Sequence, residues 1–97
     1  MKYILSFPTP LSEVNAVDDN VDVLVTTEDG REYTFVIATP NNLTTLMEKE
    51  ALPYLKPGAP FLFVKELSED NIRLLLDDLM EEDRKILEIY GNDFNQA

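Results

Sequence analysis

Clustered carboxylates are the side chains in this sequence whose type and spacing could do chemistry. Five of the seven residues from Asp77 to Asp83 are acidic. Such groups can transfer protons, ligate a cation or attract a basic surface. Proton transfer near neutral pH requires a carboxylate desolvated in a cleft, so that its pKa rises. The surroundings of these carboxylates therefore decide which of the three roles is open to them.

Apolar residues between the carboxylates predict a helix that turns its acidic side to water. Its core-facing stripe recurs every three or four positions and comprises Ile72, Leu75, Leu76, Leu79 and Met80, continued by Ile86, Leu87 and Tyr90. We expect this helix over 68–90, with Ser68 as N-cap and Gly91-Asn92 at its end. Asp83 falls on the stripe, which leaves open whether the segment is one helix or two.

Four carboxylates lie off that stripe and are the predicted partner-binding residues: Asp77, Asp78, Glu81 and Glu82. Asp22 and Glu32, on the polar side of a predicted sheet, are the second choice. Leu74, also off the stripe, and Tyr54, in a proline-rich segment, are candidate exposed anchors for a partner. Hydrated carboxylates suit electrostatic recognition better than catalysis, so we expect no catalytic residue here.

A calcium loop is the other pattern that the acidic residues suggest. Asp18, Asn20, Asp22 and Asp29 occupy positions one, three, five and twelve of such a loop. Position six is Val23 where the sharp turn requires glycine, and position twelve is not the usual bidentate glutamate. We therefore expect a solvated strand edge, with no metal and no cofactor.

Composition narrows the function further. The 97 residues include 19 acidic and 8 basic ones, which gives a formal net charge of −11. This charge repels nucleic-acid phosphates and anionic membrane surfaces. The sequence has no cysteine and no histidine, which excludes disulfides, thiolate zinc sites and histidine-activated nucleophiles. We therefore expect that the protein is not an enzyme.

Localisation and domain organisation follow from length and apolar content. The sequence contains neither the apolar run of a secretory signal nor a run of the roughly 20 residues that span a bilayer. We expect a cytoplasmic protein. Hydrophobic residues make up 44% of the chain, enough for one core, so residues 1–97 are predicted to be a single domain.

The elements that must position the carboxylates form an α+β pattern. We expect a strand over 2–7, a β-hairpin over 21–37, a helix over 40–51, a strand over 61–64 and the long helix over 68–90. This order predicts a small, mostly antiparallel sheet with helices packed on one face. The strand over 61–64 is apolar on both faces, which is typical of a central strand.

Alternation fixes the register of the hairpin. A two-residue loop at Asp29-Gly30 mixes apolar and polar residues on each face. A three-residue loop closed by Gly30 in the left-handed conformation sets Val25 across from Tyr33 and Val23 across from Phe35. This second register collects the apolar residues on one face, and we therefore predict it.

The helix over 40–51 is predicted from Thr39 as N-cap and Pro40 at the first helical position. Its core stripe comprises Leu43, Leu46 and Met47, with Ala51 as a further candidate.

Together these features predict a small acidic domain that binds a protein partner with a basic surface. Inhibitor and immunity proteins that neutralise nuclease toxins work in this way as a class. The alternative is an accessory or regulatory subunit that forms homo- or hetero-oligomers through an uncovered sheet face or edge.

Overall fold

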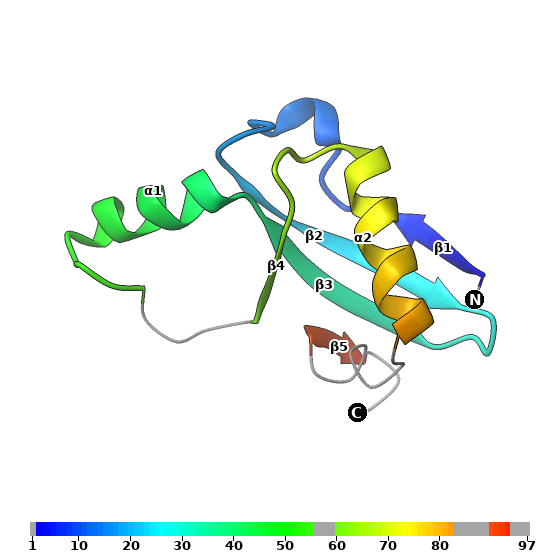
Figure 1. Cartoon of the computed structure of the whole chain (residues 1–97). Helices are drawn as coiled ribbons and strands as arrows, with labels where there is room; N and C mark the ends of the chain where they lie inside the picture. The colour runs from blue at the N-terminus through cyan, green and yellow to red at the C-terminus, as the bar shows by residue number, and fades with distance from the viewer. Residues whose placement is uncertain (1, 56–59, 83–89, 94–97) are drawn as a thin grey trace.

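The computed structural model describes residues 2–55, 60–82 and 90–93 (Figure 1). Its elements are β1 (Tyr3–Ser6), the short 3₁₀ helix η1 (Leu11–Glu13), β2 (Asn20–Thr27), β3 (Glu32–Ala38), α1 (Pro40–Glu50), β4 (Phe61–Phe63), α2 (Glu69–Glu82) and β5 (Gly91–Asp93). The sheet is mostly antiparallel, with β4 parallel to β3. The predicted α+β fold is confirmed.

The β2–β3 hairpin has the predicted register. Val25 lies opposite Tyr33 and Val23 opposite Phe35. Gly30 closes the turn with a φ of 84°, in the left-handed region that glycine adopts without steric cost. Every second residue of the two strands therefore points into the core, from Val21 to Val25 and from Tyr33 to Ile37.

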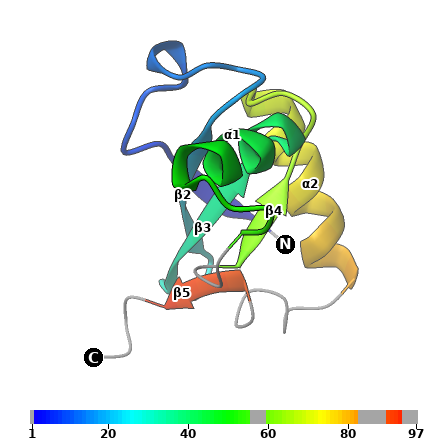
Figure 2. The same cartoon turned by 90° about the vertical axis from the view of Figure 1, so that its left-hand side faces the viewer.

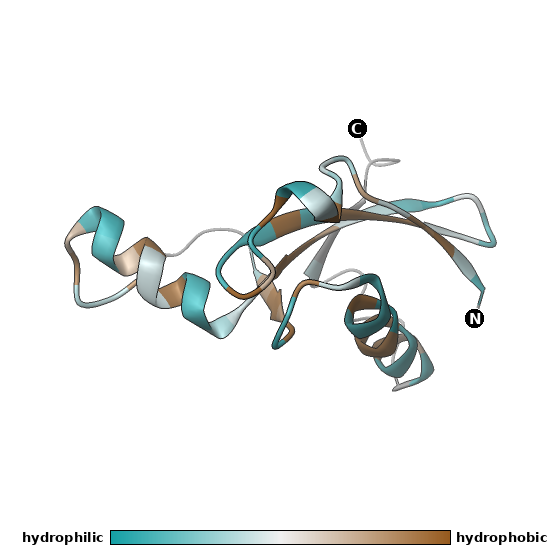
Figure 3. Ribbon diagram, turned by 90° about the horizontal axis from the view of Figure 1, so that it is seen from above, coloured by the Kyte–Doolittle hydropathy of each residue, from teal (hydrophilic) through white to brown (hydrophobic). Residues whose placement is uncertain are grey.

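The helix α2 packs on this apolar face, on one side of the sheet (Figures 2 and 3). Ile72, Leu76 and Met80 are buried against the strands, while Leu75 and Leu79 are partly buried at the margin. The Ser68 hydroxyl accepts a hydrogen bond of 3.1 Å from the Asn71 N–H, so Ser68 is the predicted N-cap. The continuation of the helix through Ile86 and Leu87 lies outside the described residues.

The position of β4 differs from the prediction. Among the described residues, β4 pairs with β3 and with no other strand, so β3 lies inside the sheet and β4 lies at the end of the sheet order. Leu62 enters the core, whereas Phe63 on the opposite face is 43% exposed. The apolar character of both faces thus reflects a half-open surface and not a central strand.

The strand β5 was not predicted, because Gly91-Asn92 resembles a helix end and has little strand propensity. Tyr90 is helical, and the chain then pairs antiparallel with β3, where Tyr33 lies opposite Asp93 and Phe35 opposite Gly91. Because β4 pairs with β3 only at residues 36–38, it leaves the edge at residues 33–35 vacant, and β5 pairs there.

The helix α1 begins at Pro40 as predicted and extends away from the end of β3 (Figure 1). Its apolar side chains, Leu43, Leu46 and Met47, are partly buried and lie outside the main core. Ala51 does not belong to this stripe. It is exposed, has a left-handed φ of 55° and ends the helix.

In the part of the chain that the structure describes, no helix combines the length and apolar character needed to cross a membrane.

Candidate functional site

The helix α2 presents the predicted carboxylates to solvent. Asp77, Asp78 and Glu81 are all exposed, because they point away from the buried stripe. Glu82 ends α2, and its side chain lies outside the described part of the structure. The structure thus brings three of the four predicted residues onto one surface.

Asp22 and Glu32 lie elsewhere. Both are exposed, and both alternate with core residues along β2 and β3. They therefore occupy the face of the sheet opposite α2, which we call the outer face. The structure does not join this second pair to the carboxylates of α2.

Leu74 lies among the helix carboxylates and is 69% exposed. Asp70, one turn before it, is exposed as well. We call this set the acidic surface of α2; it comprises Asp70, Leu74, Asp77, Asp78 and Glu81. A solvated leucine surrounded by carboxylates contributes little to folding, since its apolar area remains in water. Tyr54, the other candidate anchor, is 54% exposed and lies in the segment after α1.

Asp77 has a structural partner that sequence patterns do not reveal. The Tyr3 hydroxyl donates a hydrogen bond of 2.6 Å to Asp77 Oδ1, and it lies 3.5 Å from the Arg73 carbonyl oxygen. Partial burial and the hydrogen bond to Asp77 raise the pKa of Tyr3 to about 12. The phenol therefore stays protonated near neutral pH and serves as a hydrogen-bond donor between β1 and α2.

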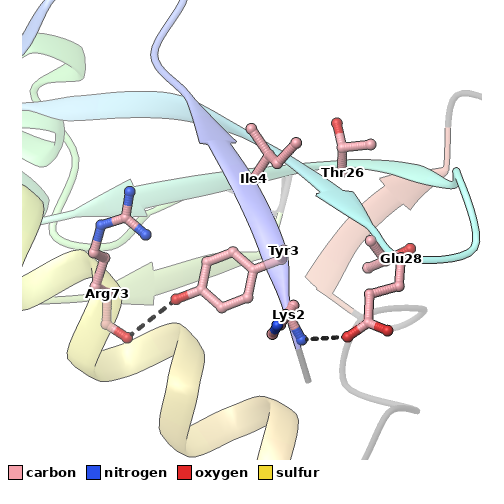
Figure 4. A pocket seen from close by; sticks show the side chains of 7 residues that line it. Lys2, Tyr3, Ile4, Thr26, Glu28 and Arg73 are labelled. Atoms are coloured by element: carbon pink, nitrogen blue, oxygen red, sulfur yellow. Dashed lines mark hydrogen bonds between the residues drawn. The ribbon is translucent and has the colours of Figure 1, made fainter.

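Two hollows flank this contact. One has a volume of about 580 Å³ and is lined by β1, the end of β2 and Arg73 (Figure 4). The other has a volume of about 360 Å³ and is lined by Asp70, Arg73, Leu74 and Asp77. Arg73 lines both, and its Nε donates to Glu69 Oε2 at 3.1 Å. Arg73 therefore lies between the hollow beside β1 and the hollow on the acidic surface of α2.

The residues of the notional calcium loop serve other purposes. Asp18 accepts hydrogen bonds from Asn42 Nδ2 at 3.3 Å and Thr45 Oγ1 at 2.7 Å, and Asn20 Nδ2 donates to Asn42 Oδ1 at 2.7 Å. This network fastens α1 to the loop before β2. Asp29 instead lies in the hairpin turn, where it accepts from the Arg31 N–H.

Thr39 also departs from its predicted role. It occupies the N-cap position, but its hydroxyl makes no cap hydrogen bond and instead accepts from the Asp19 N–H at 3.4 Å.

Within the described ranges, no three acidic side chains gather in a way that could hold a metal ion.

The outer face of the sheet is partly open. Ile4 on β1 is 68% exposed and Phe63 on β4 is 43% exposed. Phe61 lies beside Phe63, with ring centroids 6.3 Å apart. Two sequence patterns indicate this exposed apolar area: the alternation of residues along β1 and the apolar residues on both faces of 61–64.

No family model, curated protein or solved structure matches this chain, so its function rests on the chemistry of these surfaces.

Proposed function

We propose that this protein is an acidic protein-binding domain whose partner presents a basic surface. An inhibitor or immunity-type protein that neutralises a basic toxin such as a nuclease fits this description. The observation that carries the proposal is Leu74, 69% exposed among the carboxylates of α2. An apolar anchor within a charged rim is a common arrangement at protein interfaces, because the anchor supplies burial and the rim supplies selectivity.

Electrostatics supports the same proposal. With a net charge of −11, the protein attracts a cationic partner from a distance and accelerates their encounter. Carboxylates arranged along one helix can also occupy sites that a basic protein uses for phosphate groups. The raised pKa of Tyr3, about 12, keeps its hydroxyl protonated as the hydrogen-bond donor to Asp77, which holds β1 beside the acidic surface of α2.

The outer face of the sheet favours a second candidate function. Ile4 and Phe63 expose apolar area on this face. Such area suits an accessory or regulatory subunit that forms homo- or hetero-oligomers. Assembly through the outer face would bury Ile4 and Phe63, whereas the acidic surface of α2 would stay exposed to solvent.

A pull-down with matched charge variants tests the leading proposal. The test variant neutralises Asp77, Asp78, Glu81 and Glu82 to Asn or Gln. The control carries the same charge change at four other positions, Glu13, Glu48, Glu50 and Glu66, each changed to Gln; all four are exposed. Both are used as bait in a lysate of the source organism, with mass spectrometry of the retained proteins.

We expect wild type and control to retain a common basic protein that the test variant loses. Equal retention by both variants would contradict the proposal. Retention that survives both variants but disappears with Ile4→Ser and Phe63→Ser would instead support the second candidate function.

A further inference from the structure

The strand β1 has an open edge. It pairs with β2 on one side, and within the described residues no strand pairs with its other side. An exposed edge offers unpaired N–H and C=O groups to any extended chain of suitable chemistry.

The hairpin hydrogen bonds reveal which residues of β1 present those groups. The Thr27 N–H donates to the Arg31 carbonyl at 2.9 Å, so the backbone groups of Thr27 point toward β3. Because these directions alternate along a strand, those of Thr26 point toward β1, where Ile4 lies opposite. The backbone groups of Ile4 are therefore paired with β2, whereas those of Tyr3 and Leu5 point to the open edge.

The contact at Lys2 agrees with this assignment. Its backbone N–H donates to Glu28 Oε1 at 2.8 Å, on the β2 side (Figure 4). Lys2 and Ile4 share one direction, and Tyr3 and Leu5 share the other.

The side chains of β1 reach both hollows described above, since Tyr3 and Ile4 line the larger one and the Tyr3 hydroxyl donates to Asp77 at the smaller one. On the side of α2, Asp70, Leu74 and Asp77 line the smaller hollow. On the outer face, the exposed Ile4 side chain borders the larger one. A chain added at this edge would therefore meet carboxylates on one side and an apolar group on the other.

We propose that the open edge of β1 binds an extended basic segment of the partner protein, which adds to the sheet as a further strand. This inference rests on the proposed function and specifies how the partner is recognised. Successive side chains of a strand point to opposite faces. The bound segment thus directs Lys or Arg toward Asp70 and Asp77, and directs alternate apolar residues toward Ile4.

Charge selects a basic segment over a second copy of this chain. Two copies each carry a net charge of −11, and pairing their β1 edges would bring the two acidic surfaces close together. A cationic segment is instead attracted to the acidic surface of α2.

A synthetic octapeptide of alternating Lys and Val, labelled with a fluorophore, is the probe. Fluorescence anisotropy measures its affinity for the whole chain. Asp70→Asn with Asp77→Asn should weaken binding about tenfold, because two charge pairs are lost. The amide oxygen introduced at position 77 can still accept from the Tyr3 hydroxyl. Glu48→Gln with Glu50→Gln on α1 makes the same charge change away from the edge and should leave the affinity unchanged.

Amide hydrogen exchange tests the added strand. In the free protein, the Tyr3 and Leu5 amides should exchange fast and the Ile4 amide slowly. Saturating peptide should slow exchange at Tyr3 and Leu5 by at least about tenfold and leave Ile4 unchanged.

The outcomes separate this inference from the proposed function. Peptide binding that depends on Asp70 and Asp77 without protection of Leu5 would overturn strand addition and leave the acidic surface as a binding site. Failure of the peptide to bind would also overturn it, while the pull-down would still decide the proposed function. Protection of Leu5 that rises with protein concentration in the absence of peptide would show that two copies pair, which also contradicts the inference.

Discussion

The Tyr3 hydroxyl donates a 2.6 Å hydrogen bond to Asp77 Oδ1, which joins residues 74 positions apart in the chain. Through this contact the Tyr3 side chain of β1 is held against α2. Asp77 consequently belongs both to the tertiary structure and to the acidic surface of α2. Asp78 and Glu81 are exposed neighbours of Asp77 on the same surface.

Removing this hydroxyl should destabilise the fold. Tyr3→Phe keeps the ring but deletes the donor, so we expect the free energy of unfolding to fall by about 1 kcal/mol. Urea denaturation measures this change. Tyr54→Phe is the matched control, since Tyr54 is 54% exposed, and it should have almost no effect. Equal stabilities for Tyr3→Phe and wild type would show that the hydrogen bond is not maintained in solution.

The same phenol predicts a dependence of stability on pH. Folding raises the pKa of Tyr3 from 10.0 to about 12, so the folded state holds this proton more tightly than the unfolded chain. The contribution is therefore fully present below pH 10.0 and is lost as the pH rises toward 12. Denaturation of wild type and Tyr3→Phe across this range should give a difference that shrinks with pH. A constant difference would contradict the assignment.

Gly30 should resist substitution because of its backbone conformation alone. Its φ is 84°, and a Cβ placed there would meet no atom within 4 Å. Gly30→Val should therefore cost about 1 to 2 kcal/mol of stability through left-handed strain without any clash. Gly30→Asn should cost less, since asparagine adopts this conformation more readily. Thermal denaturation compares the two variants, and a neutral valine would refute the turn geometry.

Neutralising the acidic surface should separate binding from stability. Asp77 and Glu81, and Asp78 and Glu82, are like charges four residues apart, and each pair opposes the helix by a few tenths of a kcal/mol. Changing all four to Asn or Gln should leave the thermal midpoint equal or slightly higher, since an amide at position 77 still accepts from the Tyr3 hydroxyl. Association with a basic partner should become slower and less dependent on salt. Unfolding of this variant would mean that the fold requires these four groups as carboxylates and does not accept amides in their place.

The end of α1 offers a stabilising substitution. Ala51 has a φ of 55°, and its N–H donates to the Glu48 carbonyl at 3.1 Å. Glycine avoids the Cβ strain at such a position, so Ala51→Gly should raise stability by about 0.5 to 1 kcal/mol. Glu50→Gly, one residue earlier within the helix, should lower it by a similar amount. A calorimetric midpoint that falls for Ala51→Gly would contradict the left-handed assignment.

Local patterns predicted those parts of the fold that depend on near neighbours. The register of Val23 with Phe35 follows from the alternation of apolar residues within each strand and from Asp29-Gly30 in the turn between the strands. The exposure of Asp77, Asp78 and Glu81 follows from the helical period around Ile72 and Leu76. Such patterns depend on residues that are close together in the chain, so the sequence alone is sufficient to predict them.

Tertiary structure decided what depends on distant pairing. Gly91–Asp93 forms β5 because β3 has a vacant edge there, although its own residues do not favour a strand. Asp18 fastens α1 through Asn42, and Asp77 receives the Tyr3 hydroxyl. Within the described residues, β1 has an open edge because it lies first in the sheet order and pairs with β2 on one side. Each of these features joins segments that no local periodicity relates, since the energy of a contact depends on which surfaces meet after the chain has folded.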